Sequence, residues 1–132
     1  LKKDLPVIRE RFAKLVPGPV NGHIPILIGG SGPKVTLRLV AEHGDMWHAF
    51  GSPEEMARRA AILDEHCATI GRDPGEIERS GGINKATLDQ ADEYVQQGIT
   101  HLIIGVSGPD YDLGPLRELI QWRDERRKQR VA

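Results

Sequence analysis

The chain has 132 residues, and its 18 Lys and Arg residues nearly balance 19 Asp and Glu residues, for a formal charge of −1 at pH 7. This length suffices for one ordinary hydrophobic core. The charge balance, and the lack of a basic stretch interleaved with aromatic residues, argue against nucleic-acid binding. No apolar run approaches membrane-spanning length, and the first residues are not typical of a signal peptide. One cysteine, Cys67, excludes an intramolecular disulfide and indicates the reducing cytoplasm.

The first 22 residues predict a helix and a linker. Apolar residues recur on one helical face over residues 4–15, namely Leu5, Ile8, Phe12 and Leu15. Pro17-Gly18-Pro19 then stops any helix, and a loop follows.

Residues 25–34, Pro-Ile-Leu-Ile-Gly-Gly-Ser-Gly-Pro-Lys, predict a buried strand, a glycine-rich turn and the start of a helix. The glycines of this turn lack a Cβ, so the backbone can turn sharply and approach a ligand closely. Pro33 suits the first position of a helix over residues 33–43, whose apolar side chains available for burial are Val35, Leu37, Leu39 and Val40. Free N–H groups at a positive helix end favour a phosphate, although a tight strand–helix connection without a ligand explains the pattern equally well.

Three further strand–helix pairs follow in order. Residues 45–50 predict a strand, and Ser52 and Glu55 predict a capping box at the start of a helix that Gly71 ends. The apolar face of that helix comprises Met56, Ala60, Leu63, Cys67 and Ile70, so we expect Cys67 to be a buried core thiol.

A third strand is expected over residues 77–83. Thr87 predicts a second capping box, for a helix that ends at Gly98. Residues 100–106 predict a fourth strand, and the last helix is expected to begin near Asp112 or Leu113. The charged tail 123–132 predicts a solvated, fraying helix end.

This alternation predicts an α/β fold with parallel strands covered by helices. A (β/α)8 barrel typically needs about 250 residues. We therefore expect residues 23–122 to form a parallel (βα)4 half of a (β/α)8 TIM barrel, after an N-terminal helix and linker over 1–22. A free-standing doubly wound sheet is the alternative. The chain also lacks an initiator methionine, so a fragment, a trimmed chain or a processed product is expected.

Ligands of parallel α/β proteins bind at the carboxyl ends of the strands. His48 and Phe50 share a face near the end of the second predicted strand, where His48 can contact a ligand or serve as a hydrogen-bonded core residue. Lys34 and Arg38 either add charge to the turn or, as the favoured interpretation, are solvated. The histidines do not fall at metal-ligand spacing with Asp, Glu or Cys, so we expect no metal.

Residues 25–34, together with the segment from Thr36 to Trp47, resemble the luciferase-like monooxygenase superfamily. Within this superfamily, the sequence of these segments most resembles the branch that uses the deazaflavin coenzyme F420. The segments 52–77 and 98–104 resemble the same family, so the resemblance covers residues 22–120.

The resemblance implies a barrel with a flavin or deazaflavin across the carboxyl ends of its strands. It implies that Gly29, Gly30, Ser31 and Gly32 bind the coenzyme phosphate, and that His48 and Phe50 line the pocket. The implied reaction is hydride transfer between coenzyme F420 and a small-molecule substrate, or monooxygenation with FMN.

The family's N-terminal half is missing here, and the segment between Gly82 and Thr87 is shorter than usual. We therefore assign no catalytic residue and do not expect the chain alone to be active. The alternative is a non-catalytic half-barrel that self-associates as a homo-oligomer or binds a phosphorylated ligand.

Overall fold

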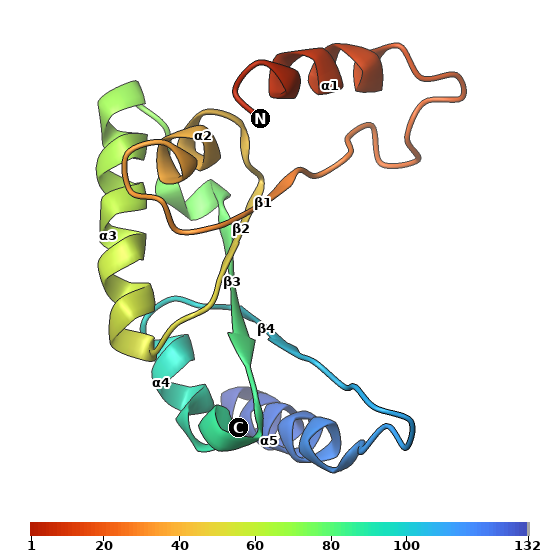
Figure 1. Ribbon diagram of the computed structural model, residues 1–132, viewed down its shortest axis with the longest axis vertical. Helices are drawn as coiled ribbons and strands as arrows, with labels where there is room; N and C mark the ends of the chain where they lie inside the picture. Colours follow the sequence, from red (N-terminus) through yellow and green to blue (C-terminus); the bar gives the residue numbers. More distant parts are fainter. Residues whose placement is uncertain (132) are drawn as a thin grey trace.

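The computed structural model describes residues 1–131, and within this range four parallel strands alternate with helices (Figure 1). The strands are β1 (Leu27–Gly29), β2 (Met46–Ala49), β3 (Glu78–Ile83) and β4 (His101–Ile104). The α-helices are α1 (Asp4–Ala13), α2 (Thr36–His43), α3 (Pro53–Ile70), α4 (Ala91–Gln96) and α5 (Gly114–Val131). Two 3-10 helices of the described range are η1 (Pro74–Glu76) and η2 (Lys85–Gln90). The predicted α/β half-barrel is confirmed.

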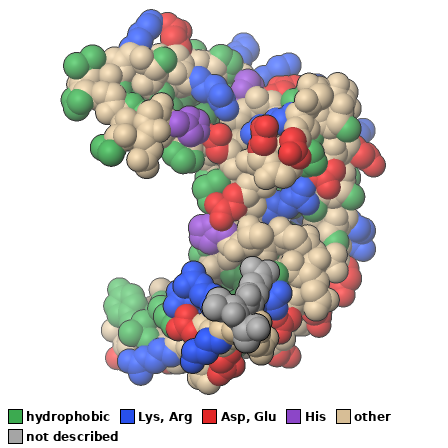
Figure 2. Space-filling view, turned by 180° about the vertical axis from the view of Figure 1, so that it is seen from behind, with side chains coloured by type: hydrophobic (Ala, Val, Ile, Leu, Met, Phe, Trp, Pro, Cys, Tyr) green, Lys and Arg blue, Asp and Glu red, His purple; other side chains and the backbone are tan. Residues whose placement is uncertain are grey.

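The strands lie side by side in chain order, β1-β2-β3-β4. A doubly wound sheet needs a point where this order reverses, so the alternative fold is excluded. Because right-handed crossovers that all run in one direction place their helices on one side of a sheet, α2, α3 and α4 gather on the same face (Figure 1). The molecule is hollowed on the opposite side (Figure 2). This second face corresponds to the interior of a barrel.

The core lies between the sheet and this layer of helices. Ile28, Trp47 and Ala49 point from the strands into it and are at most 3% exposed. The helices contribute most of the rest, including Leu37, Met56, Leu63, Cys67 and Tyr94. Cys67 is therefore a buried core thiol, as expected, and burial raises its pKa.

Several positions on the predicted apolar faces are not buried. In α1 only Leu5 is buried, because the helix contacts the rest of the described chain near its start and projects away from it (Figure 1). The helix α2 was predicted to begin at Pro33 but begins at Thr36. Val35 therefore precedes the helix, and it is 56% exposed. Ile70, the last residue of α3, is 48% exposed.

The predicted capping boxes had different outcomes. Ser52 accepts a hydrogen bond from the Glu55 N–H, Glu55 accepts one from the Ser52 N–H, and Gly71 ends α3 with a φ of 70°. The capping box predicted to begin at Thr87 begins instead at Asn84, whose Oδ1 lies 2.8 Å from the Ala86 nitrogen, because an Asn side chain readily bonds the backbone two residues on. Thr87 is the third residue after this cap, and its Oγ1 accepts a hydrogen bond from the Asn84 N–H at 3.1 Å.

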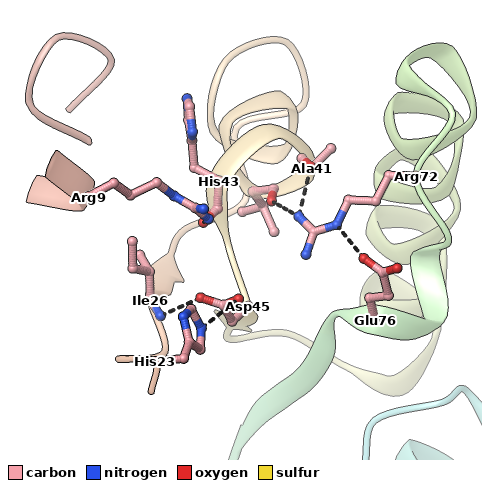
Figure 3. Close-up of polar contacts among 9 residues, drawn as sticks. Arg9, His23, Ile26, Ala41, His43, Asp45, Arg72 and Glu76 are labelled. Atoms are coloured by element: carbon pink, nitrogen blue, oxygen red, sulfur yellow. Dashed lines mark hydrogen bonds and ion pairs between the residues drawn. The ribbon is translucent and has the colours of Figure 1, made fainter. Parts of the chain in front are cut away.

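Arginine side chains cap the carboxyl end of α2 (Figure 3). Arg72 donates from Nη1 to the Ala41 carbonyl at 2.9 Å and from Nε to Glu76 at 3.2 Å. Arg9, on α1, donates to the His43 carbonyl. These carbonyls lack partners within the helix, so the guanidinium groups satisfy orphan acceptors at the negative end of the helix dipole.

Asp45 fixes the start of β1 against β2 (Figure 3). Its Oδ2 accepts from the Ile26 N–H at 2.7 Å, and its Oδ1 lies 3.2 Å from His23 Nε2. Ile26 and Asp45 directly precede β1 and β2, so this polar cluster lies at the amino ends of the strands. Parallel sheets bind ligands at the opposite, carboxyl ends, and the cluster therefore serves stability.

The predicted charged tail 123–132 falls in the second half of α5 as far as Val131, and residue 132 lies outside the described residues. No helix in the described range combines the length and apolar character needed to cross a membrane.

Candidate functional site

The sheet register brings four residues into one row across the open face. Gly29 pairs with His48, His48 with Ser80, and Ser80 with His101. Side chains alternate between the two faces of a strand. Since Trp47 and Ala49 point into the helix-covered core, His48 and its row lie on the open face.

His48 and Ser80 form a hydrogen-bonded pair in this row. His48 Nδ1 lies 2.9 Å from Ser80 Oγ, and Ser80 is fully buried while His48 is half-buried. Two effects lower the pKa of His48 below its ordinary value of 6.5: mainly the burial of the imidazole and, to a smaller extent, the nearby His101. His48 is therefore a neutral hydrogen-bonding group at pH 7.

Phe50 lies just beyond the end of β2 and is 75% exposed. Its ring meets the His48 imidazole edge-on, with 4.9 Å between the centroids and 86° between the planes. A Cβ added to Gly82 would lie 2.3 Å from two of the Phe50 ring carbons. The ring therefore rests directly on the Gly82 backbone and presents an apolar surface at the carboxyl end of the sheet.

The glycine turn is held in place from β2. Trp47 donates from Nε1 to the Gly30 carbonyl at 2.7 Å, and the Gly30 N–H donates to the His48 carbonyl at 2.9 Å. Gly30 has a φ of +125°, which side-chain-bearing residues rarely adopt, and its missing Cβ would lie 3.2 Å from Thr36 Cγ2. By contrast, a Cβ on Gly29 would meet nothing within 4 Å.

Two N–H groups of this turn have no acceptor within the described part of the chain. They belong to Ser31 and Gly32, which lie between β1 and the start of α2. They are the kind of donors that bind phosphate oxygens at a helix N-terminus. Lys34 is exposed, and Arg38 Nε lies 3.6 Å from Glu42 Oε1, so neither side chain is shown to reach the turn.

The structure thus brings together the two predicted groups of site residues. Gly29 to Gly32 and His48 with Phe50 come from the neighbouring strands β1 and β2, at the same edge of the sheet. Sequence reasoning missed Ser80 as the partner of His48, and it did not see that Gly82 supports Phe50. The position of Ser80, two residues before Gly82 in β3, places both on one face, but only the register shows which face that is.

No group of three His, Cys, Asp or Glu side chains in the described range is arranged to hold a metal ion. The polar groups at this edge are instead backbone N–H groups, a neutral imidazole and a hydroxyl. Such donors suit an organic ligand with phosphate or carbonyl oxygens.

The model of the luciferase-like monooxygenase family matches residues 7–131, so the chain belongs to this family. The match includes most of α1, which lies outside the stretch that carried the resemblance. Among solved structures, one similar chain is an F420-dependent secondary alcohol dehydrogenase in complex with an F420–acetone adduct. The two have a TM-score of 0.58 and 15% identity over 70% of this chain and 46% of that chain. This likeness supports the fold, and the present chain spans less than half of the dehydrogenase. A comparison with curated proteins gave no match.

Proposed function

We propose that this chain is the C-terminal half-barrel of a coenzyme F420-dependent oxidoreductase that transfers hydride between the coenzyme and a small-molecule substrate. FMN is the alternative coenzyme, with monooxygenation as its reaction. One observation carries the proposal: the glycine turn and the His48–Phe50 pair lie on adjacent strands at the ligand-binding edge of the sheet. The family, which is one of oxidoreductases, supports the reaction class.

The residues present fit such a coenzyme. Ser31 and Gly32 offer unpaired N–H groups to a phosphate, and Gly29 leaves open space before the sheet. Phe50 offers an exposed ring to a flat heterocycle, and His48 a neutral polar group beside it. The coenzyme itself supplies the hydride chemistry.

We expect this chain to bind the coenzyme without turnover. The open face of the sheet covers one side of a ligand, and the residues described here supply no evident acid, base or nucleophile beside the neutral His48. We also propose the cytoplasm as its compartment, because Cys67 is a free buried thiol.

Fluorescence titration of the purified chain with F420 and, separately, with FMN tests the binding. Gly30→Ala is expected to weaken binding, because the turn must change its backbone angles. Gly71→Ala is the matched control, since Gly71 also has a positive φ, of 70°. Gly71 follows the carboxyl end of α3, whereas the amino end of α3, at Ser52, is the end that follows His48 and Phe50 in the chain. The proposal fails for this chain if neither coenzyme binds, or if both variants weaken binding equally.

A non-catalytic half-barrel that self-associates is the second candidate. Apolar side chains on the open face are uncovered, among them Leu27 at 47% and Ile103 at 40% exposed. The sheet also ends in β1 and β4, which have no further strand beside them among the described residues. Two copies can cover these surfaces together. A strict monomer at micromolar concentration, measured by sedimentation equilibrium, would count against this function.

A further inference from the structure

Ser80 is a fully buried polar residue on the face of the sheet that carries His48. Its Oγ lies 2.9 Å from His48 Nδ1 and has no other hydrogen-bond partner among the described residues. A buried hydroxyl is costly to leave without an acceptor for its hydrogen. The arrangement of this one bond therefore decides where the imidazole carries its proton.

We propose that Ser80 is a positioning residue that holds His48 as the neutral tautomer protonated on Nε2, so that Nε2–H donates to a carbonyl oxygen of the bound ligand. In this arrangement the Ser80 hydroxyl donates to an unprotonated Nδ1. The opposite arrangement, with Nδ1–H donating to Oγ, leaves the hydroxyl hydrogen without an acceptor among the described residues. The ligand assignment rests on the proposed coenzyme site, whereas the tautomer does not.

The surroundings of His48 favour its neutral form. His101, from β4, is the nearest titratable neighbour across Ser80, and it lies 3.8 Å from Glu78 of β3. The uncharged Phe50 ring covers another side of the imidazole. Burial and the His101 charge both oppose protonation of His48, as its lowered pKa reflects.

His48 Nε2 is free to meet a ligand. It makes no hydrogen bond within the described residues, and the side chain is half-buried on the open face rather than enclosed. A carbonyl oxygen is the matching partner, because it accepts a hydrogen bond and carries no proton of its own. Flavin and deazaflavin rings present such oxygens, and so does a ketone substrate.

Imidazole ¹⁵N–¹H correlation spectra of the full chain test the tautomer. The chain has five histidines, and the signals missing from His48→Asn assign His48. We expect Nδ1 to resonate as an unprotonated nitrogen and Nε2 as a protonated one. Ser80→Ala is expected to give a mixture of tautomers, and Ser80→Thr to restore the single form. A protonated Nδ1 in the unaltered chain overturns the proposal, and this spectrum decides even if Ser80→Ala does not fold.

Titration with F420, with FMN and with acetone then tests the donor role. A downfield shift of the Nε2–H proton with a coenzyme alone assigns the acceptor to its ring, and a shift that needs acetone assigns it to the substrate. His48→Phe is expected to weaken binding by roughly 2- to 10-fold, as for one neutral hydrogen bond. Coenzyme binding without any Nε2–H shift overturns the donor role, whereas failure of both coenzymes to bind refutes the proposed function and leaves the tautomer standing.

Discussion

Replacing Gly30 with alanine tests how the glycine turn is built. Gly30 has a φ of +125°, and its carbonyl and N–H are both held by β2, so the residue cannot relax without losing these bonds. The alanine methyl group would also lie 3.2 Å from Thr36 Cγ2, which forces a shift of a few tenths of an ångström. Backbone strain is therefore the main expected effect.

A residue held at such an angle costs about 1–3 kcal/mol. With a urea m-value of about 2 kcal/mol per molar, this cost lowers the unfolding midpoint by roughly 0.5–1.5 M. Urea unfolding followed by circular dichroism measures this change.

Gly29→Ala is the matched control for this experiment. Gly29 neighbours Gly30, is not in the positive-φ region, and has no atom within 4 Å of the position of an added Cβ. We expect Gly29→Ala to be neutral or to stabilise the chain by about 0.4–1 kcal/mol through the unfolded state. Equal midpoints for the two variants would refute the assignment of backbone strain to Gly30.

Four further predictions follow from particular contacts. Gly82→Ala pushes the Phe50 ring off the sheet, because its Cβ would lie 2.3 Å from that ring; the ring-current shift on His48 should vanish, and an unchanged shift would contradict the contact. Arg72→Ala should lower the free energy of unfolding by about 1–3 kcal/mol, because the Ala41 carbonyl at the end of α2 loses its hydrogen-bond donor. Glu76→Ala, which removes only an exposed ion-pair partner of Arg72, should cost less than about 1 kcal/mol, and equal losses in urea would disprove the capping role. Cys67 should react with a thiol reagent only when the chain unfolds, because it is fully buried with a raised pKa, and fast modification of the native chain would show otherwise. The lowered pKa of His48 means that the unfolded chain binds its proton more readily, so stability should fall as pH drops below about 6.5, and His48→Asn should flatten this slope; an unaltered slope would contradict the assignment.

Local sequence signals predicted the elements well where short-range chemistry decides them. The Ser52–Glu55 capping box and Gly71 define α3 without help from the rest of the chain. The same rule placed the next cap three residues too late, because Asn84 takes the N-cap position of a 3-10 helix and Thr87 is the third residue after it. Burial was less predictable than secondary structure, as exposed Val35 and Ile70 show, because it depends on which neighbouring element covers each position.

The sequence by itself determined the parallel α/β class, the strand–turn–helix unit at Gly29 to Gly32 and the candidate residues His48 and Phe50. These depend on alternation, glycine conformation and side-chain parity, which are local properties. Only the tertiary structure decided that β1 and β2 place these residues side by side, and that Ser80 lies against His48. The physical reason is that strand register and winding direction are set by packing between distant segments, so the partner of a side chain on the open face cannot be read from its own strand.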